Sequence, residues 1–358
     1  MTVIGNISFS GFGVMTLPEI FYYIGYSLDK RYKLKRQQRL PHKVISIGNI
    51  TVGGTGKTPA TIAVAEEAKK RGFSPIILTR GYRGKAKRPV FVQQSAKENS
   101  LLRHSITPSL LYGDEPVLMA ERLKDVPIVK CADRYEGGMF FLQNYEPSAM
   151  SHQPIFILDD GFQHWRLYRD MDIVLVDGLK PFGNRRMLPI GPLREPLKEL
   201  KRADIFVVTK TRNESLSNEL RGINPHAPVY FSEYRMLGLR DSNGTELPME
   251  TLKNKKVYAF CGIANPESFR QTVLSITGDI AGFKIYGDHY KYTETDILYL
   301  GKQCKALNCD FLITTEKDMV KLRELNTPDN LLCVEIGFYV DEGFFDYLFG
   351  GTYHNGGG

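Results

Sequence analysis

From residue 43 onward, short apolar runs alternate along the chain with longer amphipathic segments. The runs are rich in β-branched residues, and several are apolar throughout, which is typical of strands in a parallel sheet covered on both faces. The predicted strands are 43–50, 74–80, 127–131, 154–160, 172–178 and 203–210. Helical spacing appears between some of them, at 57–71 and 114–124. This repetition of strand and helix predicts a doubly wound α/β architecture with a mostly parallel sheet.

A second group of alternating segments begins near residue 228. It opens with an extended connector, after which strand and helix patterns resume. The predicted strands are 255–261, 280–286, 310–315 and 331–340, and the predicted helices are 265–276, 293–307 and 316–324. Because this group is as long as a small domain, we expect a boundary between two domains. The expected division is an apolar N-terminal helix with a basic flank at 1–40, a larger domain at 41–227, a hinge or connector at 228–240, a smaller α/β domain at 241–350, and a tail at 351–358.

The N-terminal segment 7–26 is apolar and aromatic but is interrupted by Pro18 and Glu19. Basic residues follow it rather than precede it, and no small-residue cleavage site follows, so a signal peptide is excluded. The basic residues are Lys30, Arg31, Lys33, Lys35, Arg36 and Arg39. The pattern favours a helix that lies in a bilayer surface, with its aromatic face in lipid and its basic flank on anionic headgroups. The alternative is a helix docked on the protein core.

The composition excludes a disordered protein but does not identify the binding partner. The chain has 358 residues, of which 42% are hydrophobic, including 20 Phe and 19 Tyr, so it can bury a sizeable core and is not disordered. Its net charge of +7 suits an anionic partner, whether nucleotide, nucleic acid or anionic lipid. The five cysteines form no CxxC pair, which indicates free thiols in a reducing compartment.

The sharpest motif is GNITVGGTGKTP at 48–59, which directly follows a predicted strand and opens a predicted helix. Its glycines let backbone N–H groups surround a phosphate, Lys57 can reach the β- and γ-phosphates, and Thr58 can coordinate Mg²⁺. The motif departs from the usual phosphate-binding loop only where Thr51 replaces the first glycine. The expected nucleotide-binding residues are Thr51, Val52, Gly53, Gly54, Thr55, Gly56, Lys57 and Thr58.

Carboxylates follow a second buried strand, in the run IFILDDGFQH. Asp159 and Asp160 stand where a phosphate-loop protein keeps its second metal-organising carboxylate. Because adjacent residues of a strand point to opposite faces, one can face the nucleotide while the other anchors the turn. Gln163 and His164 extend beyond the strand end, at the edge where ligands bind in such sheets. The alternative is that both carboxylates are solvated turn residues.

Other candidates are less specific. Asp114 opens a helical stretch and is equally well explained as a helix N-cap. His289, in YGDHY, is by itself an ordinary surface histidine. An Asp–His pair at a domain cleft would form a general base for a hydroxyl, but the sequence does not show the two in contact. The loop 182–197 carries Arg194 and Glu195, and its arginines suit a transferring phosphate or, alternatively, solvent.

Taken together, these motifs resemble those of the tetraacyldisaccharide 4'-kinase family. The resemblance rests on a series of short blocks that run in order over nearly the whole chain. These blocks are VGGTGKTP (52–59), LTRGYRGK (78–85), GDEP (113–116), ADR (132–134), LDDGFQH (158–164), LPIGPLREP (188–196), FCGIANPESF (260–269), GDHY (287–290) and TTEKD (314–318). The series is more specific than any one block.

The resemblance implies an ATP-dependent kinase of lipid A (lipopolysaccharide) biosynthesis. Such an enzyme transfers the γ-phosphoryl group of ATP, with Mg²⁺, to the 4'-hydroxyl of a tetraacylated glucosamine disaccharide 1-phosphate and forms lipid IV-A. It implies a phosphate-loop (P-loop) domain joined by a β-ribbon hinge to a smaller C-terminal domain. It also implies a peripheral position on the cytoplasmic face of the bacterial inner membrane, anchored by the N-terminal helix. We expect a monomer that binds no nucleic acid.

The resemblance also implies roles for individual residues. Asp114, paired with His289, would be the general base, and Lys57 and Arg194 would act on the transferring phosphate. The metal-organising group would be Thr58, Asp159, Asp160, Gln163 and Glu195, with the division of roles among them open. Tyr82, Arg134 and His164 would contact the substrate. Glu316 and Lys317 match the family pattern without an evident chemistry.

Two rival functions come from other classes. A P-loop GTPase or metallochaperone is disfavoured because no N-K-x-D guanine motif is present. A nucleic-acid-binding ATPase is disfavoured because the basic residues cluster at 30–39, beside an aromatic helix, instead of along a domain face.

Overall fold

The computed structural model describes residues 15–92, 107–145, 152–323 and 325–350. Residues 7–14 of the expected N-terminal helix and the expected tail at 351–358 lie outside this range. Within it, thirteen strands form one sheet. The strands are β1 (Lys43–Gly48), β2 (Phe73–Thr79), β3 (Val90–Phe91), β4 (Ile128–Lys130), β5 (Gln153–Asp159), β6 (Met171–Asp177), β7 (Ile205–Thr209), β8 (Val229–Asp241), β9 (Glu246–Leu247), β10 (Val257–Cys261), β11 (Ile280–Ile285), β12 (Phe311–Thr315) and β13 (Leu331–Val340).

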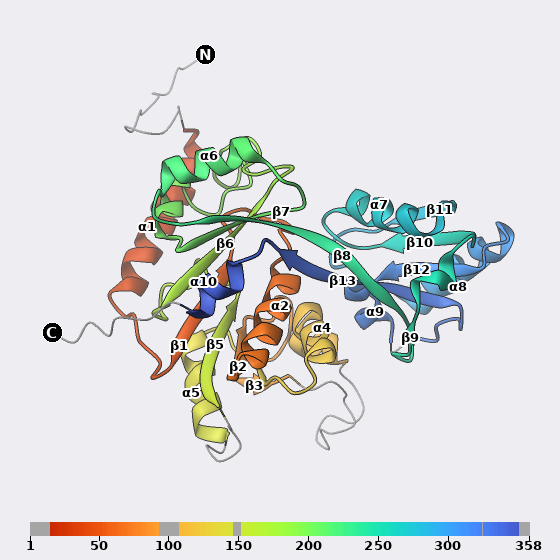
Figure 1. The fold of residues 1–358 in the computed structure, drawn as a ribbon, viewed down its shortest axis with the longest axis horizontal. Helices are drawn as coiled ribbons and strands as arrows, with labels where there is room; N and C mark the ends of the chain where they lie inside the picture. Colours follow the sequence, from red (N-terminus) through yellow and green to blue (C-terminus); the bar gives the residue numbers. More distant parts are fainter. Residues whose placement is uncertain (1–14, 93–106, 146–151, 324, 351–358) are drawn as a thin grey trace.

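The helices cover this sheet at its two ends (Figure 1). The α-helices are α1 (Leu17–Leu34), α2 (Lys57–Lys70), α3 (Pro108–Tyr112), α4 (Asp114–Arg122), α5 (Arg134–Asn144), α6 (Glu214–Ile223), α7 (Pro266–Thr277), α8 (Glu294–Ala306), α9 (Glu316–Leu322) and α10 (Phe344–Gly350). Two 3₁₀ helices, η3 (Leu197–Arg202) and η4 (Met249–Leu252), complete the described elements. The element types agree with those predicted from the sequence.

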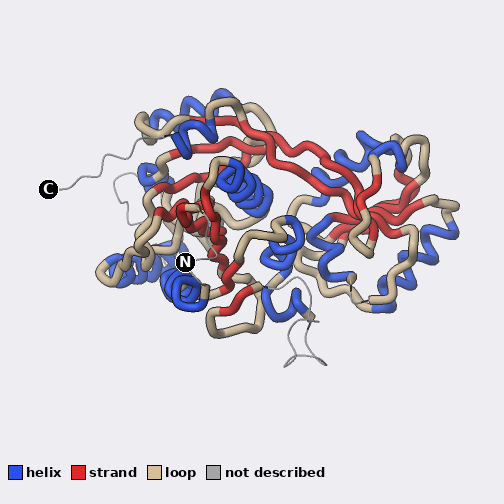
Figure 2. Tube along the Cα trace, turned by 60° about the horizontal axis from the view of Figure 1, so that its bottom comes forward, coloured by secondary structure: helices blue, strands red, loops and turns tan. Residues whose placement is uncertain are grey.

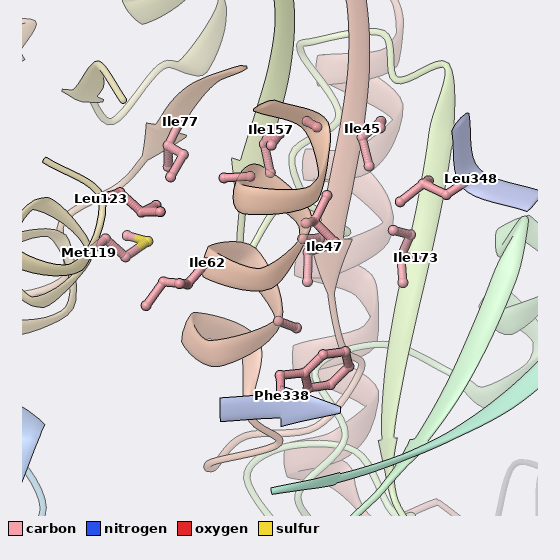
Figure 3. Packing of buried hydrophobic residues seen from close by; sticks show 14 of the residues in the cluster. Ile45, Ile47, Ile62, Ile77, Met119, Leu123, Ile157, Ile173, Phe338 and Leu348 are labelled. Atoms are coloured by element: carbon pink, nitrogen blue, oxygen red, sulfur yellow. The ribbon is translucent and has the colours of Figure 1, made fainter. Parts of the chain in front are cut away.

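The larger half of the sheet has the strand order β8-β7-β6-β1-β5-β2-β4-β3, and only β3 is antiparallel to its neighbour within it. Its central strands are buried because α2 and α4 cover one face and α5 covers part of the other. Ile45, Ile47 and Ile77 of the sheet belong to one buried cluster with Ile62 of α2, whose side chain lies on the side of the helix that faces Met119 of α4 (Figure 3). The doubly wound, mostly parallel P-loop architecture is therefore confirmed, and it brings the carboxyl ends of β1 and β5 side by side.

Two long strands connect the halves of the molecule (Figures 1 and 2). β8 starts parallel to β7 and then pairs antiparallel with β13, from Ser232 opposite Val340 to Asp241 opposite Leu332. The segment 228–240, expected as an extended connector, is thus one strand of a two-stranded ribbon. At its far end β13 continues the sheet into β12, β10 and β11, which are parallel and are covered by α7, α8 and α9.

The end of the chain departs from the division expected from the sequence. α10 lies within the range 241–350 assigned to the smaller domain, but it packs on the larger half. Phe344 and Leu348 are buried with Ile45 of β1, and Phe73 stacks on Phe349. The reason is the return of β13 along β8, which carries the chain back across the ribbon before α10 begins (Figures 1 and 3).

The N-terminal helix also differs from its expected form. Pro18 and Glu19 do not interrupt α1 but begin it, because Pro is accepted in a first turn and Thr16 and Glu19 form a capping box. Glu19 is buried and accepts a hydrogen bond from Arg186 Nε at 3.0 Å. The basic residues expected to follow the helix begin within its last turns. Among the described helices, none is both long and apolar enough to span a bilayer.

Two faces of α1 have different surroundings. Tyr22 and Tyr26 pack toward the larger half, where Tyr22 donates a hydrogen bond to the Arg194 carbonyl at 2.9 Å. On the outside, apolar side chains recur every three or four residues and lie exposed. They are Leu17, Phe21, Ile24, Leu28 and Tyr32, which we call the outer stripe of α1. The helix is therefore docked on the protein and still presents an apolar face.

Candidate active site

The phosphate loop lies between β1 and α2, as the motif predicts. Gly53 and Gly56 have φ angles of 110° and 84°, which favour glycine. Gly56 also lacks room for a side chain, because a Cβ atom there would lie 1.4 Å from the Tyr234 hydroxyl. Tyr234 comes from β8 and donates a hydrogen bond to the Thr55 carbonyl at 3.1 Å. The connecting ribbon therefore touches the loop directly, a contact that the sequence analysis did not anticipate.

The other loop residues are held from the opposite side. Thr51 forms an isolated antiparallel β-bridge with Leu193, and the Val52 N–H donates a hydrogen bond to the Pro192 carbonyl at 2.8 Å. The Lys57 ammonium group lies 3.2 Å from Asn49 Oδ1 and 3.7 Å from Asp160 Oδ1. α2 begins directly after the loop and has no side-chain cap. The backbone N–H groups of its first turn, which includes Thr58, and of Gly54 can therefore bind an anion.

Asp159 and Asp160, at the end of β5, have opposite electrostatic environments. Asp159 is buried and accepts a hydrogen bond from Thr79 Oγ1 at 3.0 Å. Burial, with Glu115 and Asp160 nearby, raises the pKa of Asp159 to about 7. Burial also opposes ionisation of Asp160, but Lys57 and Arg194 outweigh it and hold the pKa of Asp160 below its usual value. Arg194 Nη1 lies 2.9 Å from each Asp160 oxygen.

Gln163 and Glu195 form a second layer behind this pair. Gln163 Nε2 donates to the Asn49 carbonyl at 2.7 Å and to Glu195 Oε1 at 2.6 Å. Glu195 is fully buried, and its other oxygen accepts hydrogen bonds from Arg202 at 2.7 Å and Tyr26 at 3.2 Å. Because both Glu195 oxygens have protein partners, the geometry favours a positioning role for Glu195 over direct metal ligation.

Asn49 is a functional candidate that the sequence analysis missed. Its side chain accepts from Lys57 and its backbone accepts from Gln163, so it links the phosphate lysine to the layer behind the carboxylates. The sequence does hold one indication of this role, because Asn49 lies at the carboxyl end of the predicted strand 43–50, and ligands bind at the carboxyl ends of strands in such sheets.

Arg134 and His164, expected to contact substrate, are both largely buried. The Arg134 N–H donates to His164 Nε2 at 3.3 Å, so the histidine uses that nitrogen as an acceptor. Burial and the positive charge of Arg134 lower the pKa of His164 to about 2. His164 is therefore a neutral support for Arg134. The Arg134 Nε atom is buried with no hydrogen-bond partner among the described residues, and its side chain interacts electrostatically with Asp160 and Asp159.

The structure brings Asp114 and His289 together, although 175 residues separate them. Asp114 is the first residue of α4, on the larger half, and His289 follows β11 on the smaller half. Asp114 Oδ2 lies 3.1 Å from His289 Nδ1. The exposed ring of Tyr82 lies 5.5 Å from the imidazole, and Arg83 Nη1 donates to the His289 carbonyl at 3.3 Å.

One cavity of about 1380 Å³ joins the nucleotide side of the site to His289. Its lining includes the phosphate loop, Asp159, Asp160, Arg194 and His289, together with residues of α1. The volume exceeds that of most small-molecule pockets, so it can hold a nucleotide and part of a second ligand. No cluster of three or more His, Cys, Asp or Glu suited to a metal occurs among the described residues. Thr58 and the two carboxylates nevertheless fit Mg²⁺, which binds through one or two carboxylates together with nucleotide phosphates.

Comparison with known proteins identifies the family. The family model described as tetraacyldisaccharide-1-P 4'-kinase matches residues 19–349. The tetraacyldisaccharide 4'-kinase of Syntrophus aciditrophicus (strain SB) is 36% identical over 337 residues, covering 88% of this chain and 87% of that protein. The enzyme of the same name from Syntrophobacter fumaroxidans is 36% identical over 336 residues, covering 91% and 84%.

A solved structure agrees with these matches. The crystal structure of LpxK from Aquifex aeolicus in complex with ATP is 30% identical and aligns with a TM-score of 0.67, covering 90% of this chain and 93% of that one. The resemblance predicted from the sequence motifs is thereby confirmed. A match over most of the chain, and relatives of this identity, show that the chain belongs to the tetraacyldisaccharide 4'-kinase family.

Proposed function

We propose that this chain transfers the γ-phosphoryl group of ATP to the 4'-hydroxyl of a tetraacylated glucosamine disaccharide 1-phosphate, forming lipid IV-A. One observation carries the proposal: the phosphate loop and His289, which contacts Asp114, line one cavity. A phosphoryl donor and a proton acceptor for an alcohol are the two groups that such a transfer needs. Family membership supports the identity of both substrates.

Each part of the site has a task in this reaction. Lys57 and the N–H groups of the loop and of α2 bind the phosphates. Thr58, Asp159 and Asp160 would hold Mg²⁺, which neutralises phosphate charge when bound. Arg194 keeps Asp160 ionised and adds positive charge at the cavity wall. Asp114 accepts the proton of the sugar hydroxyl, and His289 orients Asp114 through its Nδ1 atom.

We propose further that the protein works as a peripheral enzyme on the cytoplasmic face of the bacterial inner membrane. The outer stripe of α1 and the basic residues at the end of that helix suit an anionic lipid surface. Residues of α1 also line the cavity, and they include Phe21 of the outer stripe as well as Tyr22 and Tyr26, so the stripe borders the site. A lipid-embedded acceptor could then reach the site without leaving the membrane.

The test is incubation of the protein with γ-labelled ATP and the tetraacyl disaccharide 1-phosphate, followed by lipid extraction and chromatography. We expect label in a lipid product, and Asp114→Asn should lower kcat by about 10²-fold or more while ATP affinity stays within about twofold. Label released only as free phosphate, at a rate unaffected by the lipid, would contradict the proposal. Loss of ATP binding in the variant would instead make Asp114 structural.

A further inference from the structure

The segment TTEKD matches the family pattern, yet the sequence offered no chemistry for Glu316 and Lys317. The structure places both at the start of α9, beside the Asp114–His289 pair. The Lys317 ammonium nitrogen lies 3.4 Å from His289 Nε2, 3.1 Å from Glu115 Oε1 and 3.7 Å from Asp288 Oδ1. The imidazole therefore stands between a carboxylate on one nitrogen and an ammonium group on the other.

These two contacts select one protonation state of the ring. An ionised Asp114 can only accept a hydrogen bond, so Nδ1 must carry the proton. A lysine ammonium can only donate, so Nε2 must present its lone pair. Both contacts are satisfied only when His289 is neutral and protonated at Nδ1.

Lys317 is held in its charged form. Burial lowers its proton affinity, but Glu115 and Asp288 outweigh this and raise the pKa of Lys317 above its usual value. The charged groups that face His289 come from several elements packed around it. They are Asp114 of α4, Asp288 of its own loop, Lys317 of α9, and Arg83 beside Tyr82, with Glu115 of α4 next to Lys317.

Glu316 fixes the start of α9 where Lys317 can reach the ring. Its Oε1 atom accepts from Arg122 Nη1 of α4 at 2.9 Å, and its Oε2 atom accepts from the Ile336 N–H of β13 at 3.1 Å. Ile336 lies at a register shift in the β8–β13 pairing. The helix that carries Lys317 is thus attached to both the helix that carries Asp114 and the connecting ribbon.

We propose that Lys317 is a positioning residue that holds His289 neutral and protonated at Nδ1. A neutral imidazole donates a hydrogen bond to Asp114 without forming an ion pair, and the carboxylate therefore keeps its affinity for the proton of the substrate. Without Lys317, Nε2 would face Asp288, whose Oδ2 atom lies 3.9 Å away, with Glu115 nearby, while Arg83 contacts the His289 carbonyl and not this nitrogen. The ring would then gain a second proton at higher pH. The inference rests on the proposed role of Asp114 as the base.

The first experiment determines by NMR which nitrogen of the His289 imidazole carries a proton, and it does not depend on catalysis. In ¹⁵N-histidine-labelled protein, with His289→Gln to assign the signal, we expect Nδ1 protonated and Nε2 unprotonated at pH 8. In Lys317→Met, protonation of Nε2 should move up by about one pH unit or more, as expected when a charge within hydrogen-bonding distance is removed. A protonated Nε2 in the wild-type protein would overturn the proposal without any variant.

The second experiment follows kcat against pH. Lys317→Met should move the acid limb upward by about one unit, whereas Lys317→Arg, which keeps the charge, should leave it near its wild-type position. The matched control is Arg323→Met, which removes another α4–α9 ion pair, to Glu121 at 2.8 Å, and should not move the limb. A loss of rate equal at every pH, or a raised KM for ATP with an unmoved limb, would overturn the proposal. Failure of Asp114→Asn to affect kcat, with the ring signals as expected, would count only against the base assignment.

Discussion

Asp159 and Asp160 are neighbours in sequence, yet the fold affects their ionisation in opposite directions. The difference arises from their partners. Asp159 has a hydroxyl partner and nearby carboxylates, whereas Asp160 has Arg194 and Lys57. In the folded protein Asp159 keeps its proton up to about pH 7, but in the unfolded chain it loses the proton near pH 4. Unfolding therefore releases a proton between these values, and the free energy of unfolding contributed by Asp159 falls as the pH rises from about 4 to about 7.

This difference predicts that Asp159→Asn stabilises the protein while it impairs the reaction. At pH 8 we expect a gain of about 2 kcal/mol in the free energy of unfolding, because an uncompensated buried charge is removed. At pH 5 the gain should be about a third as large, because Asp159 is then ionised in the unfolded chain but still protonated in the folded protein. Urea unfolding at the two pH values measures the effect.

Asp160→Asn provides the matched control. The pKa of Asp160 is lowered by folding, so its stabilising contribution is present above pH 4 and is lost as the pH falls through the folded value. Its replacement should therefore destabilise the protein at pH 8. Destabilisation by both variants would contradict the environments described for the two carboxylates.

At the scale of elements, α1 serves two surfaces at once. Its inner face supplies Tyr26 to Glu195 and Tyr22 to the Arg194 backbone, so the helix supports the site. Its outer stripe is apolar and exposed, with Phe21 at 71% and Leu28 at 64%. Deletion of the helix would remove both functions together. Substitutions on the stripe separate them.

We expect Ile24→Glu combined with Leu28→Glu to reduce cosedimentation with anionic phospholipid vesicles by about tenfold or more, since two exposed apolar anchors outside the cavity become charged. Activity on a detergent-dispersed substrate should change little, because the inner face is intact. Leu298→Glu is the control, since Leu298 is equally exposed at 64% but lies on α8 in the smaller half. If the wild type, the double variant and Leu298→Glu bind vesicles equally, α1 is not the membrane anchor.

The sequence predicts most elements because their patterns are local. The phosphate loop, its flanking strand and helix, and the carboxylates after β5 all follow from runs of fewer than fifteen residues. Contacts between distant segments do not follow from local patterns. Tyr234 reaches Thr55 across 179 positions, and Lys317 reaches His289 across 28. The start of α1 was also missed, because Pro18 within an apolar run reads as a break until its capping partner is seen.

At the scale of the whole molecule, the larger half is completed by the end of the chain. Phe338, Phe344 and Leu348 are buried in its core after the chain has passed through the smaller half and returned along β13. A fragment that ends inside the smaller half would leave the matching core surface uncovered. Loss of a buried Phe alone costs about 3–5 kcal/mol.

This return path predicts how the smaller half can be removed. Arg235 and Gly337 are paired in the ribbon, so an Asn-Gly turn between them would join residues 1–235 to 337–350 as a hairpin. We expect this protein to unfold cooperatively in urea, whereas the fragment 1–235 should aggregate or unfold without a clear transition. Similar behaviour of the two would show that α10 contributes little to the core.

The proton acceptor and the residue that orients it come from different halves of the molecule, with Asp114 on the larger and His289 on the smaller. The phosphate loop, in contrast, is carried by the larger half alone. Movement of the smaller half away from α4 would therefore leave the phosphate loop intact but part His289 from Asp114. Phosphoryl transfer thus depends on the contact between the two halves, whereas retention of the nucleotide does not.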